Sequence, residues 1–514
     1  MASLSVDNSS GVVPTTAAAI AALPIAAYLI NRLLFPTIDP REPPILRPTI
    51  PFIGHILSLI REQNHMFDRL YREKKLPICT LPMLNGSLYV INEPRLIAAA
   101  MRNQNLSFEP FSVEFAAPTL GMSKRHIEIY SQPGTMDKFA QVIHNSMVGD
   151  NLTSMNTVAL GEIAKYLNMV SSEKGLALES GFEWLRELMA LVTLRTLFGR
   201  ENPLGKEALP DLWEFDKGLG FLALGIAPTL LAPKALAARD RLQKRLEPFY
   251  LKGLDQGDDV SPLMKFRGAQ ERLIGFFDHE LTKPESSMLF VSTSNTIPTL
   301  FWLFSHIFAD SKLLSKIRDE VETLVTVESN AEGGRTATLD LGPLEKQCPM
   351  LHAVYLEVLR LYSDLIGTRR VIEDTTLRDP VTGQEYFLRK GVNVQWCSKV
   401  AHHVQEVWGD DSEIFKPGRF INTTTLDEKK RRGALIPFGG GKHLCPGRNF
   451  ARLENIGLVS ALAIGFDLEG VVLPPARDAY LGTAMKRPEF GGKTDPIKIT
   501  RRKGWEDVTW AFKC

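Results

Sequence analysis

The feature that most constrains the fold of this chain is a glycine-rich segment at residues 438–447, with the sequence FGGGKHLCPG. Glycines let the backbone turn tightly and aim its N–H groups at one sulfur atom, that of Cys445. Residues 448–454, RNFARLE, are typical of the start of a helix. A helix amino end and a bound iron would both favour thiolate over thiol. The alternative is a buried free cysteine behind a glycine turn.

These glycines do not form a phosphate-binding loop. The pattern G-x-x-x-x-G-K-S/T needs a glycine where Ile436 stands, and a hydroxyl residue where His443 follows Lys442. A nucleotide-phosphate site is therefore excluded at this position.

Cysteine usage and composition narrow the possible chemistry. The five cysteines are odd in number and widely separated, which fits a reducing compartment and excludes paired zinc ligands. Any metal chemistry therefore depends on one cysteine. With 514 residues, of which 44% are hydrophobic, the chain can bury a large cofactor. A net charge of +1 and the lack of a basic stripe interleaved with aromatics argue against nucleic acid as a partner.

An uncharged apolar segment covers residues 12–30, close to the roughly 20 residues that a helix needs to cross a membrane. Arg32 and Arg41 follow this segment and no Lys or Arg precedes it, which places the rest of the chain in the cytosol. We expect residues 1–35 to form a tail and a single-pass transmembrane helix, with a cleaved secretory signal as the alternative. Closely spaced prolines then predict a hinge over residues 36–54.

Beyond the hinge, Leu and Ala runs with charged faces between about residues 203 and 322 favour helices. Strand patterns occur at residues 87–91, 385–388 and 392–396. An apolar patch at residues 219–233 is either a shallow membrane contact or a buried helix and turn. The charged run at residues 427–432 predicts a solvated loop, which could also dock an acidic partner.

The glycine-rich segment matches the signature F-x-x-G-x-R/H-x-C-x-G of the cytochrome P450 family, the haem-thiolate monooxygenases. The matching residues are Phe438, Gly441, His443, Cys445 and Gly447. Two further motifs of the family follow the same order: E-x-x-R at Glu357 and Arg360, and a later arginine segment at Arg419. An i,i+3 ion pair alone is commonplace. The three motifs together make the chain resemble this family, in its microsomal form.

The resemblance implies a mainly α fold with small β-sheets, the cytochrome P450 fold, in which residues 55–514 form the catalytic haem domain. It implies that Cys445 ligates the iron of haem b. It also implies a structural ion-pair triad of Glu357, Arg360 and Arg419.

The family usually clamps the haem propionates with cationic side chains. Candidate cofactor contacts at matching positions are Arg370, His443 and Phe438. Arg369 is the alternative to Arg370. The W-x-x-x-R contact of the family is not evident between residues 122 and 151, so one propionate contact stays unassigned.

On the helix above the haem, the family usually carries A/G-G-x-D/E-T, whose acid and threonine deliver protons to bound oxygen. Here residues 292–298 read STSNTIP, so Thr296 matches while Asn295 replaces the acid. An amide does not transfer protons near neutral pH, so delivery falls to Thr296 and ordered water. Asn295 could instead be a helix residue bonded to neighbouring backbone, without a catalytic part. The Asn-Thr-Ile-Pro run, in which Pro298 can kink the helix, is similar to that of sterol hydroxylases and prostacyclin synthase.

The resemblance implies a haem-thiolate monooxygenase that oxidises a lipophilic small molecule, a terpenoid, steroid or polyketide of secondary metabolism. Electrons would come from a separate NADPH-cytochrome P450 reductase, since no G-x-G-x-x-G dinucleotide motif is present. We expect a single-pass protein of the endoplasmic reticulum membrane, in contact with lipid, with its catalytic domain in the cytosol.

Asn295 leaves open a haem-thiolate isomerase or dehydratase that needs neither O2 nor reductase, and a haem-bound carrier or sensor without turnover. Residues 365–366, 484–485 and those around Thr293 resemble the substrate-pocket segments of the family. Ordinary core packing explains these segments almost as well.

Overall fold

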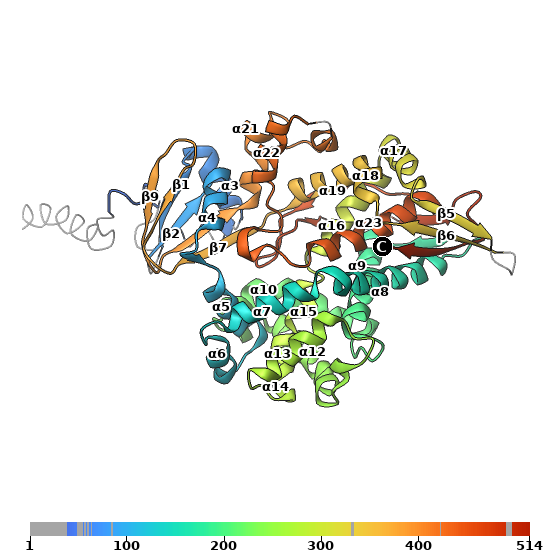
Figure 1. Cartoon of the computed structure of the whole chain (residues 1–514), viewed down its shortest axis with the longest axis horizontal. Coiled ribbons are helices and arrows are strands. Elements are labelled where there is room, and N and C mark those ends of the chain that lie inside the picture. Colours follow the sequence, from blue (N-terminus) through green and yellow to red (C-terminus); the bar gives the residue numbers. More distant parts are fainter. Residues whose placement is uncertain are drawn as a thin grey trace, which may run out of the picture.

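The computed structural model describes residues 39–48, 55, 58, 61–62, 64–83, 86–329, 334–421, 423–489 and 496–514. This part of the chain is mainly helical with small sheets, as expected (Figure 1). The predicted membrane anchor at residues 1–35 lies outside the described residues, and only residues 39–48 of the hinge lie inside them. Of the helices in the described ranges, none combines the length and hydrophobicity that a membrane span requires.

The helices preceding the sequence STSNTIP are α3 (Asn64–Lys74), α4 (Pro94–Arg102), α5 (Glu109–Leu120), α6 (Lys124–Tyr130), α7 (Thr135–Ser146), α8 (Gly149–Asn168), α9 (Gly181–Phe198), α10 (Leu209–Ala223), α11 (Pro228–Leu231), α12 (Pro233–Leu251), α13 (Pro262–Leu273), α14 (Asp278–Glu285) and α15 (Ser287–Val291). Those that follow are α16 (Thr296–Phe308), α17 (Ser311–Glu322), α18 (Leu344–Gln347), α19 (Pro349–Tyr362), α20 (Ser398–His403), α21 (Gln405–Trp408), α22 (Thr425–Ala434) and α23 (Arg448–Gly465). The helical pattern predicted between residues 203 and 322 is confirmed.

The largest sheet lies at one end of the molecule beside α3 and α4 (Figure 1). Its strand order is β1 (Ile78–Met83), β2 (Gly86–Ile91), β10 (Asn393–Cys397), β7 (Ile366–Val371) and β3 (Leu106–Ser107). β10 pairs with β2 in parallel and with β7 antiparallel, so β7 and β10, which both follow α19, lie side by side. The predicted strands at residues 87–91 and 392–396 are thus confirmed as β2 and β10.

Four smaller sheets complete the described fold. They are β11 (Phe466–Glu469) with β14 (Ile497–Arg501) and β4 (Leu176–Leu178); β15 (Val508–Lys513) with β6 (Arg335–Asp340) and β5 (Val325–Ser329); β12 (Ala476–Arg477) with β13 (Arg487–Pro488); and β8 (Thr375–Arg378) with β9 (Glu385–Leu388).

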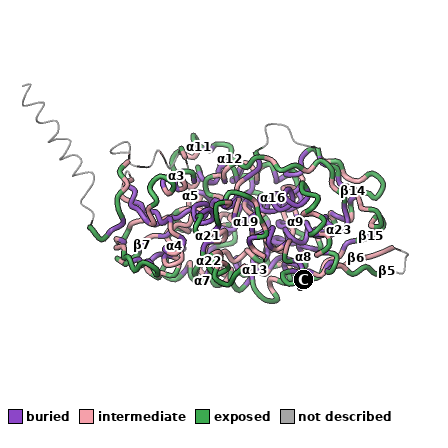
Figure 2. The backbone as a smooth tube through the Cα atoms, turned by 90° about the horizontal axis from the view of Figure 1, so that it is seen from above, coloured by how far each residue is buried: buried purple, intermediate pink, exposed green. Residues whose placement is uncertain are grey.

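The centre of the core is α16, in which every residue from Ile297 to Phe308 is buried. A helix that is apolar all round must be covered on all sides, and α16 packs against α9, α19 and α23. Figure 2 shows these helices within the buried interior of the molecule. The segment that carries Asn295 and Thr296 is therefore fixed in the middle of the core.

Three expectations outside the core have different outcomes. The described part of the hinge lies along β1, where Leu46 N–H donates to the Thr80 carbonyl oxygen at 2.9 Å. In the apolar patch at residues 219–233, Leu219 and Leu222 are buried, as a core helix requires, whereas the connection after α10 is exposed, and the membrane contact stays a prediction. The predicted loop at residues 427–432 was wrong: it lies inside α22, capped by the Thr424 side chain, which accepts from Asp427 N–H.

Candidate active site

The segment at residues 438–447 forms a tight loop that leads directly into α23. Gly439 and Gly441 have left-handed backbone conformations, with φ of 71° and 64°. A Cβ atom on Gly441 would lie 2.2 Å from the carbonyl oxygen of Met101, so only glycine lets the loop approach the end of α4 so closely. The Cys445 N–H donates to the Phe438 carbonyl oxygen at 3.0 Å and closes the loop.

The loop surrounds the Cys445 sulfur with groups that favour negative charge. Burial raises the pKa of the Cys445 thiol, while the backbone N–H groups of Gly447 and Arg448 and the Arg448 charge oppose this rise. These groups partly offset the cost of negative charge on the buried sulfur, which is what a metal-ligating thiolate requires.

A cavity of about 480 Å³ connects this loop to the start of α16. Its lining contains five of the predicted site residues: Cys445, Phe438, His443, Asn295 and Thr296. The predicted pocket segments at residues 365–366 and 484–485 also line it. Of the residues around Thr293, Ser292 lines it, whereas Thr293 itself does not.

Of the two adjacent arginines of β7 (Ile366–Val371), Arg369 lines this cavity and Arg370 does not. Arg370 binds Glu114 at 2.5 Å and Asn393 at 3.0 Å instead. The structure therefore brings Arg369, the alternative to Arg370, to the cavity, and holds Arg370 away from it. Burial lowers the pKa of Arg369 to about 10.

Two buried ring nitrogens near Arg369 have no hydrogen-bond partner among the described residues. The Arg369 guanidinium lies over the rings of Trp396, at 5.2 Å, and Phe108, at 5.7 Å. His443 packs against the same Phe108 ring, with the ring centroids 5.6 Å apart. Neither His443 Nε2 nor Trp396 Nε1 has a hydrogen-bond partner among the described residues, although both are buried and both residues line the cavity.

This set of donors fits haem b. Its two propionate carboxylates need polar hydrogen atoms at one edge of the cavity, and Cys445 offers sulfur to the iron. Trp396 was not found by sequence reasoning, which read it only as part of a strand. Its role depends on the register of β7 and β10, which places it opposite Gly367, where a Cβ atom would lie 2.2 Å from the indole ring.

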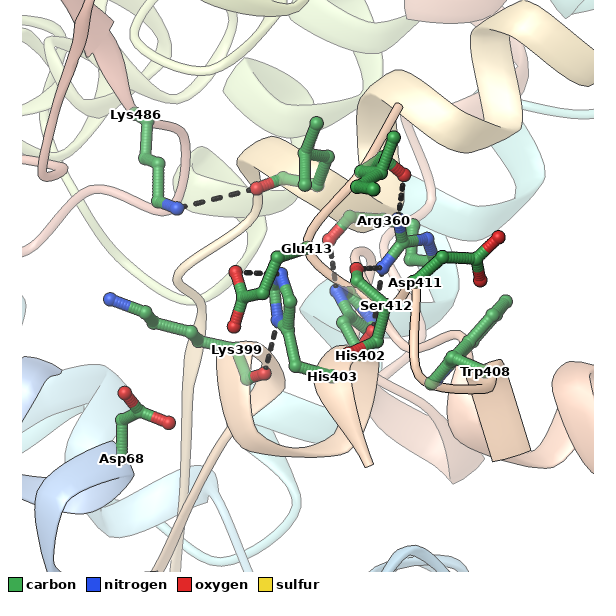
Figure 3. A network of polar contacts seen from close by, with 12 residues as sticks. Asp68, Arg360, Lys399, His402, His403, Trp408, Asp411, Ser412, Glu413 and Lys486 are labelled. Carbon is green, nitrogen blue, oxygen red and sulfur yellow. Dashed lines mark hydrogen bonds and ion pairs between the residues drawn. The ribbon is translucent and has the colours of Figure 1, made fainter. Parts of the chain in front are cut away.

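The predicted triad is buried behind the cysteine loop. Arg360 donates to both carboxylate oxygens of Glu357, at 2.7 and 2.8 Å, and Arg419 Nε donates to Glu357 Oε1 at 3.0 Å. Arg360 Nη1 also donates to the carbonyl oxygens of Ser412, at 2.6 Å, and His402, at 2.9 Å (Figure 3). These contacts bring the three residues together as the resemblance implied.

His402 connects this network to the cysteine loop. Its Nε2 accepts from the Ile436 N–H at 2.9 Å, so its proton is on Nδ1, which donates to the Arg360 carbonyl oxygen at 3.0 Å. Burial lowers the pKa of His402 well below its ordinary value, which keeps this tautomer neutral. The triad therefore fixes the start of the segment that carries Cys445.

The helix above the cavity is interrupted between α15 and α16, directly before Pro298. Because proline has no N–H, the Ser294 carbonyl oxygen lacks its helical donor and accepts instead from Arg487 at 3.3 Å. Asn295 Oδ1 accepts the backbone N–H groups of Ala484, at 2.8 Å, and Met485, at 3.2 Å. Asn295 thus ties the interruption to a wall of the cavity.

Comparisons with known proteins agree with this geometry. The sequence profile of the Cytochrome P450 family matches residues 43–469. A "Cytochrome P450 monooxygenase" of Gibberella zeae is 33% identical over 94% of this chain and 94% of its own length. The human "7-alpha-hydroxycholest-4-en-3-one 12-alpha-hydroxylase" is 22% identical over 87% of this chain and 90% of its own length.

A solved structure, "Retinoic acid bound cyanobacterial CYP120A1", superposes with a TM-score of 0.66 at 20% identity, covering 90% of this chain and 100% of that one. This likeness confirms the expected fold. The chain therefore belongs to the cytochrome P450 family, and as a member it is a haem b-binding oxidoreductase of the monooxygenase type.

Proposed function

We propose that this protein inserts one oxygen atom of O2 into a lipophilic small molecule, a terpenoid, steroid or polyketide of secondary metabolism. Electrons come from NADPH through a separate cytochrome P450 reductase. The observation that carries this proposal is one mainly apolar cavity lined both by Cys445 and by Thr296. The human relative, which is named for the hydroxylation of a steroid ketone, supports a steroid as one of the three substrate classes.

The residues that line the cavity have different roles in this reaction. Haem, when bound through the Cys445 thiolate, would supply the chemistry that cleaves the O–O bond, because a thiolate ligand donates electron density to iron. Arg369, Trp396 and His443 would hold its propionates. Apolar side chains such as Ile366, Met288 and Met485 hold the substrate and exclude bulk water.

Thr296 positions water and passes a proton at its hydroxyl. This hydroxyl has no hydrogen-bond partner within the described ranges, so it is free to bond to water in the cavity. The Asn295 amide oxygen, in contrast, is occupied by two backbone N–H groups. Asn295 therefore holds the wall in place and does not relay protons.

We also propose that the protein is a single-pass protein of the endoplasmic reticulum membrane with its catalytic domain in the cytosol. Large apolar side chains are exposed on the end of α10 and on the connection from α10 to α12, which supports a second, shallow lipid contact. They are Phe221, Leu224, Ile226, Leu230 and Leu231, the last but one being 78% exposed. Lys429, Lys430 and Arg432 on the surface of α22 support docking of an acidic reductase.

The second candidate function is a haem-thiolate isomerase or dehydratase. The replacement of an acid by Asn295, whose oxygen is already bonded, favours it, since such a reaction needs no proton delivery to oxygen. The two functions differ in what they consume.

Purified enzyme, reductase and NADPH are incubated under ¹⁸O2 with a panel of terpenoids, steroids and polyketides. A product that carries ¹⁸O and requires NADPH supports the monooxygenase. Thr296→Ala should lower product formation about 100-fold at unchanged haem content, because it removes the proton-relaying hydroxyl. A product that forms without NADPH or O2 overturns the proposal in favour of the isomerase.

A further inference from the structure

A charged side chain reaches the cavity from a helix that carries none of the family motifs. On α13, Leu263 and Arg267 both line the cavity, and Glu271 follows one turn later on the same helical face. Most other lining side chains are apolar. The buried Arg267 guanidinium is thus a hydrogen-bond donor on a cavity wall that is otherwise mainly apolar.

Arg267 uses only part of its hydrogen-bonding capacity. Its Nε donates to Glu285 Oε2 at 3.2 Å, and its Nη2 lies 2.7 Å from Glu285 Oε1 and 3.5 Å from Ser287 Oγ. Ser287 also lines the cavity. No hydrogen bond within the described part of the chain uses Nη1 of Arg267. A guanidinium has five N–H donors, so hydrogen atoms remain for a ligand.

The charges around Arg267 already balance. The Tyr130 hydroxyl donates to Glu271 Oε1 at 2.7 Å, and Glu271 interacts closely with Glu285. Burial, followed by the negative charge of Glu285, raises the pKa of Glu271 well above its ordinary value. Glu285 Oε1 lies 2.7 Å from Arg267 Nη2, so the positive charge of Arg267 is already paired within the cluster.

This balance decides which ligand group fits. A carboxylate bonded to Arg267 would leave the buried cluster with an extra negative charge, which is costly in an apolar interior. A neutral oxygen acceptor takes the free N–H groups without changing the charge. Apolar walls alone would leave these donors unpaired when water is displaced by substrate.

We propose that Arg267 determines specificity by donating a hydrogen bond to an uncharged oxygen, a ketone, ester or hydroxyl, of the lipophilic substrate. This inference rests on the proposed function, because it concerns the substrate of the same cavity. Arg267 contacts Ser287 at the start of α15, whereas Thr296 begins α16 beyond the interruption, so the two side chains line separate parts of the cavity. The oxygen that Arg267 binds is therefore not the group of the substrate that lies beside Thr296.

The test uses three probes with one carbon skeleton: androstane, androstanone and androstane carboxylate. Their dissociation constants are measured from the change in haem absorption of the ferric holoenzyme. The variant is Arg267→Met combined with Glu285→Gln, which removes the ion pair without leaving a buried charge. Arg335→Met, on the surface strand β6, is the control. Comparing ligand ratios between variants cancels differences in ligand hydration.

We expect the affinity for androstanone relative to androstane to fall about tenfold in the double variant and to stay unchanged in the control. We also expect wild-type enzyme to bind the ketone more tightly than the carboxylate. A ratio that changes by less than about twofold, a preference for the carboxylate, or no ketone binding to haem-loaded wild-type enzyme overturns the inference. Failure of the proposed function is distinct, because it appears as absent thiolate-type absorption or as turnover without NADPH.

Discussion

The Glu357–Arg360–Arg419 triad and the cluster of Arg267, Glu271 and Glu285 are both buried, but they differ in what they leave free. Every guanidinium nitrogen of the triad is bonded, either to Glu357 or to backbone carbonyl oxygens of the segment before the cysteine loop. In the other cluster, Nη1 of Arg267 has no partner in the described residues and the side chain lines the cavity. An arginine whose guanidinium nitrogens are all bonded within the protein stabilises the fold. An arginine with an unbonded guanidinium nitrogen can still donate to a ligand.

The largest effect should come from breaking the triad. Arg360→Ala leaves Glu357 and several carbonyl oxygens buried without their donor, and should cost about 3–5 kcal/mol of unfolding free energy. The measurement is urea unfolding together with the yield of haem-loaded protein. Arg335→Ala, which removes an exposed ion pair with Asp507, is the control and should change little. A loss no larger for R360A than for the control would contradict a structural role.

The cluster of Arg267, Glu271 and Glu285 should make the free energy of unfolding depend on pH. Glu271 has a raised pKa in the folded protein, and the charged or polar groups that face it are Glu285, Arg267, Tyr130 and Tyr250. Below the ordinary value of 4.5 both states are protonated and its contribution to stability is complete. As pH rises toward the folded pKa, only the unfolded state loses the proton, so stability falls.

Glu271→Gln removes this loss and keeps an acceptor for Tyr130. The variant should therefore gain about 2 kcal/mol relative to wild type between about pH 5.5 and 7, measured from urea midpoints. Glu128→Gln, at an exposed position on α6, should show no such gain. Parallel pH profiles of wild type and E271Q would show that Glu271 is ionised when folded.

Asn295 is a neutral side chain whose oxygen is already bonded within the protein, so we expect a structural role for it as well. Since its oxygen is bonded to two backbone N–H groups, Asn295→Ala should cost about 1–2 kcal/mol of stability. Product formed per haem should fall much less than in Thr296→Ala. Asn295→Asp, which keeps an oxygen that can accept both N–H groups, separates the bonding role from the amide itself. A turnover defect in N295A as large as that of T296A would assign Asn295 to proton delivery.

The smallest effect concerns the two adjacent arginines of β7. Arg370→Ala removes a partly exposed ion pair with Glu114 and should cost less than about 1 kcal/mol with haem content unchanged. Arg369→Ala should instead lower haem content, since Arg369 is the one that lines the cavity. Haem-to-protein ratios of the two purified variants give the comparison, and equal ratios would remove the distinction.

The parts of the site that were predictable are those encoded locally. The glycine spacing around Cys445 and the one-turn spacing of Glu357 and Arg360 each specify a conformation by themselves. The sequence alone could not show which of Arg369 and Arg370 lines the cavity, because the direction of each side chain depends on how the strand pairs with its neighbours. Trp396 depends on register, and Arg267 comes from a helix distant in sequence that reaches the cavity only through tertiary packing. The charged run at residues 427–432 was misread because its cap, Thr424, was not considered.

The central claim is that the Cys445 sulfur ligates the haem iron as a thiolate. The carbon monoxide difference spectrum of the reduced holoenzyme tests it most directly, measured for wild type and for Cys445→His. We predict the red-shifted band of a thiolate-ligated haem in wild type, and its loss in the variant. A wild-type protein that lacks this band when supplied with ample haem, or a variant that keeps it, would contradict the claim.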